Sequence, residues 1–158
     1  MAIDYMGLPD TGRMSSFLDA GTLIKEIGIK KVTLIPATKA SGFYLPCNKT
    51  IEVLGNFDLS MKYIWFHELV HAVEDSMYKQ CSHGESETIA CRVGLWMARI
   101  YGFGPKVSSR AIGYANLYGG FVRPDRFEEE RVKERCFYIK RKIAPHLGKK
   151  ANTNVVVY

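Results

Sequence analysis

A segment near the middle of the chain combines a helical pattern with two histidines. Its apolar residues fall at positions 61, 64, 65, 69, 72 and 73, which is the spacing of one face of an α-helix. The same segment contains the sequence His67-Glu68-Leu69-Val70-His71. Residues four apart lie about one turn apart on one side of a helix, so both imidazoles can reach a single ion. The pattern therefore predicts a helix that presents two metal ligands from one side.

Length and composition place this helix in a single folded domain. The 158 residues are 47% hydrophobic and 12% aromatic, which is enough to bury a core, so we expect one domain over residues 1–158. The formal net charge of +6 suits an acidic partner such as nucleic acid, although a modest excess is typical of a solvated basic face. The four cysteines form no CxxC pair, which favours reduced thiols. With no run of 18 apolar residues and no signal-peptide pattern, a cytoplasmic protein without membrane contact is expected.

The other elements are predicted from periodicity and turn residues. Strands are expected where β-branched or alternating residues cluster, and helices where apolar residues recur every three to four positions. The expected strands are residues 31–36, 42–45 and 50–54, with a hairpin loop at 46–49, and the further expected helices are residues 16–28, 86–101 and 126–143. The fold class that follows is α+β, with a small antiparallel or mixed sheet packed on the histidine-bearing helix and on the helix after it.

Glu68 stands beside the first histidine, where a carboxylate can act on water at the metal. In an H-E-x-x-H helix two neutral imidazoles bind Zn²⁺, and the glutamate points toward the open coordination position. There it can take a proton from the water and act as the general base. A catalytic zinc site needs a third protein ligand, and the residues after the helix offer His83, Glu85 and Glu87.

Three segments within residues 30–102 resemble a family of small metallopeptidases. They read TIEVLG at 50–55, IWFHELVHAVED at 64–75 and SETIACRVGL at 86–95. Their order is similar to that of the minimal zincin-fold metallopeptidases, in particular the gluzincin branch with the ImmA/IrrE type and the zincin-like domain of ArdC antirestriction proteins. The resemblance implies a zinc metalloendopeptidase that hydrolyses peptide bonds in a protein or peptide substrate, with Zn²⁺ as its cofactor.

The resemblance also implies a particular third ligand. In the gluzincin branch it is a glutamate on the next helix, often in the form Glu-x-x-Ala, and Glu87-Thr88-Ile89-Ala90 matches this form. His83-Gly84 is similar instead to the SprT type, whose third ligand is a histidine followed by glycine. His83 therefore stays as an alternative ligand, with Glu85 behind it. Substrate is expected to add as an extended strand at a sheet edge, for which residues 50–54 are the candidate.

Residues that support the ligands and the transition state are left open by the sequence. Cys91 stands where thermolysin-like enzymes carry an aspartate that orients a ligand histidine. Asp75, four residues beyond the motif, is a candidate for that role. Tyr114, Tyr118 or Arg110 could stabilise the oxyanion, and no spacing selects one of them.

Two other classes of protein fit the same residues. One is a non-catalytic or regulatory zincin-fold interaction protein of the antirestriction or mobile-element type, whose metal site no longer acts on substrate. The other is a SprT-like DNA-associated protease, in which basic residues of the C-terminal half, such as 140–142, hold nucleic acid. Salt-dependent DNA binding would distinguish that protease from a plain peptidase.

Overall fold

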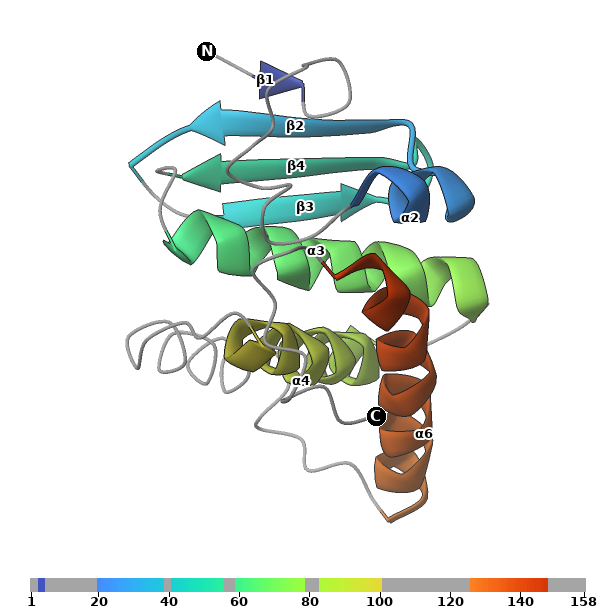
Figure 1. Cartoon of the computed structure of the whole chain (residues 1–158). Coiled ribbons are helices and arrows are strands. Elements are labelled where there is room, and N and C mark those ends of the chain that lie inside the picture. The colour runs from blue at the N-terminus through green and yellow to red at the C-terminus, as the bar shows by residue number, and fades with distance from the viewer. Residues whose placement is uncertain are drawn as a thin grey trace.

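The computed structural model describes residues 3–4, 20–38, 41–55, 59–78, 83–100 and 126–147 (Figure 1). They form the strands β1 (Ile3–Asp4), β2 (Lys31–Pro36), β3 (Ser41–Leu45) and β4 (Thr50–Gly55), the helices α2 (Ala20–Glu26), α3 (Leu59–Met77), α4 (His83–Ile100) and α6 (Arg126–Ile143), and the short 3₁₀ helix η1 (Ala144–His146). The predicted α+β class is confirmed. The candidate oxyanion donors Arg110, Tyr114 and Tyr118 lie outside the described residues.

Helix α2 ends at a glycine, as its sequence predicts. Gly28 has a φ of 79°, a conformation that glycine adopts without steric cost. Its N–H donates to the Lys25 carbonyl, and the Ile29 N–H donates to the Ile24 carbonyl. These two hydrogen bonds satisfy carbonyls that the helix end would otherwise leave unpaired, so the chain turns directly into β2.

The four strands form one mixed sheet in the order β1-β2-β4-β3. β3 and β4 are an antiparallel hairpin joined by the predicted turn at residues 46–49. β4 pairs in parallel with β2, where Lys31 lies opposite Thr50, and β1 pairs antiparallel with β2. β3, which follows β2 in the chain, therefore lies at the edge of the sheet, and the hairpin places β4 between β2 and β3. In the described part of the chain, β3 is a free edge of the sheet.

The prediction that residues 50–54 form the edge strand is wrong, because β4 pairs with a strand on each side. Ile51 and Val53 are fully buried against the helices, whereas Glu52, on the other face, is half-buried. One covered face produces this alternation in interior and edge strands alike. The pattern therefore reports burial of a face and not the position of a strand in the sheet.

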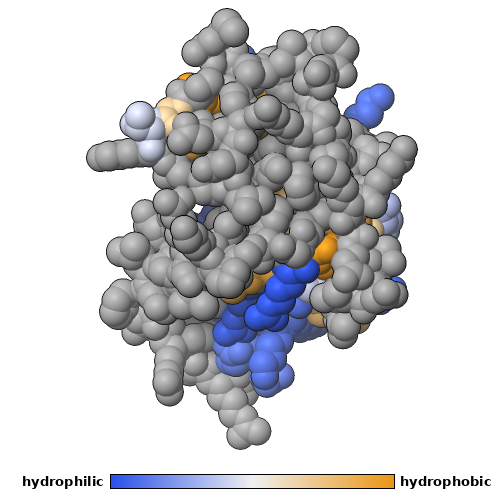
Figure 2. All heavy atoms as spheres, turned by 60° about the vertical axis from the view of Figure 1, so that its left-hand side comes forward, coloured by the Kyte–Doolittle hydropathy of each residue, from blue (hydrophilic) through white to orange (hydrophobic). Residues whose placement is uncertain are grey.

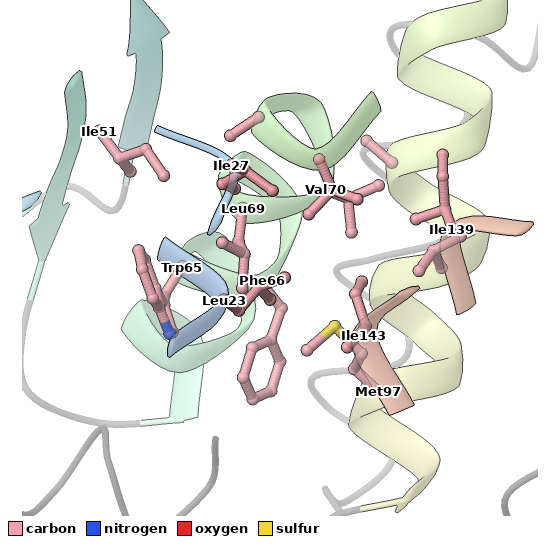
Figure 3. Packing of buried hydrophobic residues seen from close by; sticks show 14 of the residues in the cluster. Leu23, Ile27, Ile51, Trp65, Phe66, Leu69, Val70, Met97, Ile139 and Ile143 are labelled. Atoms are coloured by element: carbon pink, nitrogen blue, oxygen red, sulfur yellow. The ribbon is translucent and has the colours of Figure 1, made fainter. Parts of the chain in front are cut away.

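Helix α3 lies between the sheet and the pair α4 and α6 (Figure 1). All residues from 64 to 70 are buried. Residues four apart in α3 share a side of the helix, and each side of the helix faces a different neighbouring element. Figure 3 shows Trp65 on the side of the sheet and Val70 on the side of α4 and α6. The pair His67 and His71 follows next around the helix and faces α4.

Helices α4 and α6 cover the far side of α3. The buried stripe of α6 has helical spacing and consists of Val132, Cys136, Ile139 and Ile143. Figure 3 shows Ile139 and Ile143 of this stripe. The other side of α6 is polar, and Arg92 of α4 pairs with Glu129 at 2.8 Å. On the face shown in Figure 2, hydrophilic side chains gather at the height of these two helices. No helix in the described ranges has an apolar stretch long enough to cross a membrane.

Gly42 on β3 permits a close approach between the sheet and α3. A Cβ at this position would lie 2.6 Å from Ile64 Cγ2 and 2.9 Å from Glu68 Cγ. Neither atom is the far end of a flexible side chain, so Gly42→Ala must move β3 away from α3. We expect this variant to lower the free energy of unfolding by about 1–3 kcal/mol, measured by denaturant titration. The control is Gly84→Ala, where a Cβ meets no described atom within 4 Å; equal losses in both variants would contradict the close approach.

Candidate metal site

Three side chains from α3 and α4 bring their donor atoms together. His67 Nε2 lies 3.2 Å from His71 Nε2. One carboxylate oxygen of Glu87 lies 3.1 Å from His67 Nε2, and the other lies 3.1 Å from His71 Nε2. Within the described ranges, these three form the one group of histidine, cysteine and acidic side chains that could hold a metal ion. We call them the donor cluster.

The spacing of the donor cluster fits a zinc ion. Zinc takes nitrogen and oxygen ligands at about 2.0–2.2 Å in a tetrahedron, so two of its ligand atoms lie roughly 3.3–3.6 Å apart. The two imidazole nitrogens lie 3.2 Å apart, and each lies 3.1 Å from a different oxygen of the Glu87 carboxylate. A zinc ion between them would require the side chains to move outward, with one carboxylate oxygen as the third ligand. Two imidazoles and one carboxylate also suit zinc better than Ca²⁺ or Mg²⁺, which take oxygen ligands.

The donor cluster is largely buried, and its groups shift one another's protonation. The side chains of His67, His71 and Glu87 are 9%, 14% and 14% exposed. Although burial alone raises the pKa of Glu87, hydrogen bonds from the two histidines lower that pKa well below its ordinary range. Burial alone lowers the pKa of His71, but the hydrogen bond to Glu87 and the nearby carboxylates raise it above its ordinary value.

These shifts make the stability of the metal-free protein depend on pH. His71, whose pKa is raised, stabilises the fold below its ordinary pKa of 6.5, and this contribution is lost as the pH rises through the raised value. Glu87, whose pKa is lowered, stabilises the fold above its ordinary pKa of 4.5, and this contribution is lost as the pH falls below 4.5 and through the lowered value. With a chelator present, we therefore expect unfolding at lower denaturant concentration at about pH 8.5 than at about pH 6.

The variant His71→Ala isolates this effect, because it lacks the group whose pKa is raised. Denaturant titrations of both proteins at the two pH values should show a smaller difference in the variant. Equal responses to pH would contradict the raised pKa of His71. Zinc affinity should instead increase with pH, since the imidazoles must be neutral to bind the ion.

Glu68 lies on the side of α3 that faces β3, next to the donor cluster. The residue is 9% exposed, and burial raises the pKa of its carboxyl against the lowering effect of His67 and His71. The Tyr44 backbone N–H of β3 hydrogen-bonds to this carboxyl. The absence of a side chain at Gly42 leaves room for it. The predicted general base is therefore in contact with the edge strand and within electrostatic reach of both histidines.

The contacts behind the donor cluster were not predicted from the sequence. His71 Nδ1 lies 3.0 Å from Ser86 Oγ, and the Ser86 hydroxyl donates to Glu74 Oε2 at 3.0 Å. Ser86 directly precedes the carboxylate donor and Glu74 follows the motif by three residues, but serine at a helix start and glutamate in a helix are too common to single out. On the other ring, Cys91 Sγ lies 4.0 Å from His67 Nδ1.

Glu85, one of the two alternative third ligands, does not join the donor cluster. Glu85 is buried, and its carboxylate pairs with Arg131 of α6. His83 is the first residue of α4, which begins three residues earlier than predicted. Its side chain lies outside what the structure describes. Glu87 is thus the candidate of the three whose donor atoms the structure brings to the histidines.

Asp75 does not support a ligand histidine, so that prediction is wrong. Its carboxylate accepts a hydrogen bond from the Tyr44 hydroxyl at 2.7 Å and one from Lys49 Nζ at 2.8 Å. The side chain points to Tyr44 and Lys49 of the β3–β4 hairpin, although position 75 follows His71 by one turn on the same side of α3. These bonds fasten the hairpin to α3 and help to hold β3 beside Glu68.

The fold and the site together define an α+β protein with a candidate metal centre of two histidines and one glutamate. No family model, curated protein or solved structure matches the chain. A functional conclusion therefore depends on the residues and geometry described above.

Proposed function

We propose that this protein is a zinc-dependent metallopeptidase with a zincin-like fold. The observation that carries the proposal is the convergence of His67, His71 and Glu87 beside the buried carboxyl of Glu68. Three protein donors are the usual number in a catalytic zinc site, which keeps a fourth position for water or substrate. A nearby carboxyl that can exchange a proton is the remaining requirement for hydrolysis by activated water.

Each side chain has one role in the proposed reaction. His67, His71 and Glu87 hold the ion, which when bound polarises the scissile carbonyl and acidifies water. Glu68 accepts a proton from the attacking water and donates it to the nitrogen of the leaving amine. Burial raises the pKa of Glu68 above its ordinary value, which suits a group that must first accept a proton and then release it.

Strand β3 offers an extended substrate a place to bind. It is a free edge of the described sheet, and it runs next to the Glu68 carboxyl. A peptide can add to such an edge through main-chain hydrogen bonds. Because side chains alternate along a strand, Phe43 and Leu45 point away from α3, where they are 52% and 43% exposed. The proposed substrate is therefore a protein or peptide segment in extended conformation.

Removal and return of the metal test the proposal. We expect the purified protein to hold about one zinc ion per chain and to cleave an unfolded protein. A chelator should stop this cleavage and one equivalent of zinc should restore it, as followed by elemental analysis and electrophoresis. Absence of bound metal would show that the donor cluster is not a metal site. Bound zinc with no cleavage of a panel of unfolded proteins would favour the non-catalytic interaction protein.

A further inference from the structure

The hydrogen bonds behind His71 determine which of its ring nitrogens carries hydrogen. The Ser86 hydroxyl has a single hydrogen, and the Glu74 carboxylate can only accept, so that hydrogen lies in the 3.0 Å bond to Glu74 Oε2. The serine oxygen is then an acceptor toward His71 Nδ1, 3.0 Å away. Nδ1 must therefore be the donor in that contact. Neutral His71 in this arrangement keeps its lone pair on Nε2, the atom that faces His67 and Glu87.

We propose that Ser86 and Glu74 are positioning residues that hold Nδ1 of His71 protonated and so keep Nε2 as a metal ligand. This role rests on the proposed zinc site, and we call the two hydrogen bonds the Ser86–Glu74 relay. A metal-ligating histidine commonly donates its second ring N–H to a carboxylate or another acceptor, which orients the ring and increases its basicity. Here the carboxylate acts through a serine hydroxyl.

The position of the relay in the fold supports this assignment. Glu74 is 3% exposed and lies on α3 with His71, whereas Ser86 belongs to α4. Ser86 and Glu87 are consecutive, so the first turns of α4 meet the His71 ring from both sides: the serine at Nδ1 and the carboxylate at Nε2. A single displacement of α4 would loosen both contacts. The relay therefore couples the packing of the two helices to the orientation of one ligand.

The Ser86–Glu74 relay lies behind His71, and a contact of a different kind lies behind His67. His67 Nδ1 faces the Cys91 thiol at 4.0 Å, and a thiol is a weak hydrogen-bonding group. The buried Glu74 carboxylate places negative charge behind His71 and is among the groups that raise the pKa of that ring. A purely structural hydrogen bond between Ser86 and Glu74 would stabilise the helix pair without affecting zinc affinity. The two cases are therefore separable by measurement.

Zinc affinity in matched serine variants provides the first test. We expect Ser86→Ala to weaken zinc binding by about 10–100-fold, as loss of an outer contact to a ligand histidine does. Ser86→Thr keeps the hydroxyl and should restore most of the affinity. The control is Ser76→Ala, which removes a hydroxyl that bonds to the Val73 carbonyl of α3 and should leave zinc affinity unchanged. Competition with a chromophoric chelator measures all four proteins.

Glu74→Gln tests the carboxylate with almost no change in volume. The amide can donate as well as accept, so the Ser86 hydroxyl is free to turn and donate to His71 Nδ1. Zinc affinity should therefore fall although no cavity is created. Unchanged affinity in both Ser86→Ala and Glu74→Gln would overturn the positioning role, as would a loss in Ser86→Ala that Ser86→Thr does not relieve.

A spectroscopic readout separates failure of the relay from failure of the proposed function. In metal-free protein with both His67→Ala and Glu87→Ala, the competing acceptors at Nε2 are absent, and ¹⁵N spectra of labelled histidines report the tautomer of His71 directly. We expect the Nδ1–H form in this background and its loss when Ser86→Ala is added. Retention of the Nδ1–H form without Ser86 would overturn the relay. A tautomer that depends on Ser86, in a protein whose parent binds no zinc, would uphold the relay and reject the proposed peptidase.

Discussion

The Glu68→Gln variant is expected to retain zinc, and its kcat/KM for peptide hydrolysis is expected to fall by about a thousandfold. Glutamine has nearly the same shape as glutamate, and its carbonyl oxygen can still accept the Tyr44 N–H bond, so the donor cluster should keep its geometry. The amide cannot take a proton from water, however, and the proposed reaction then lacks its general base. Elemental analysis gives the zinc content, and kcat/KM on a peptide substrate gives the loss of transition-state stabilisation.

A second glutamate supplies the control for this substitution. Glu52 lies on β4, on the sheet face away from α3 and opposite Phe43 of the edge strand. Glu52→Gln should retain both zinc and hydrolysis. If Glu68→Gln hydrolyses peptides as well as wild type, the general base lies elsewhere. If neither wild type nor Glu68→Gln hydrolyses peptides and the two proteins behave identically in a cellular assay, the Glu68 carboxyl is vestigial. The non-catalytic interaction protein then becomes the better interpretation.

The parts of the fold that follow local rules were predictable from the sequence. β2 and α6 have the predicted bounds, because a β-branched run and a period of apolar residues are properties of short segments. The nearness of His67 to His71 follows from one helical turn and needs no tertiary information. The glutamate of the donor cluster was chosen by resemblance, and the structure brings Glu87 to both histidines.

The parts that depend on packing between distant segments were not predictable. The edge position of β3 arises because the hairpin inserts β4 beside β2, and alternation of apolar residues carries no information on strand order. Asp75 meets Tyr44 from 31 residues away, and Glu85 meets Arg131 from 46 residues away. Which residues meet in such pairs depends on how the helices and the hairpin pack against one another. Residue type and spacing along one element do not reveal them.

Removal of the third donor is the other prediction with a large expected effect. The two oxygens of Glu87 each lie 3.1 Å from one imidazole nitrogen, so this carboxylate contacts both ligand histidines at once. In the proposed site, Glu87→Ala removes an anionic ligand held on the rigid first turns of α4. We therefore expect zinc affinity to fall by more than the roughly 100-fold that loss of an outer contact can cause. Competition with a chelator measures the affinity, and the double variant with His67→Ala and His71→Ala sets the level of complete loss.

His83→Ala is the control that decides between the two resemblances. His83 begins α4 one turn before Glu87, and in a SprT-like site it would be the ligand. In a gluzincin-like site its removal should change zinc affinity little, because the donor cluster already has three protein ligands. An experimental structure of the loaded protein should then place a Glu87 oxygen about 2.0–2.2 Å from the ion. If His83→Ala instead abolishes zinc binding while Glu87→Ala is tolerated, the third ligand is a histidine. The SprT-like interpretation then becomes the better hypothesis, with a substrate linked to nucleic acid. In that case the basic residues at 140–142 would hold the phosphate backbone.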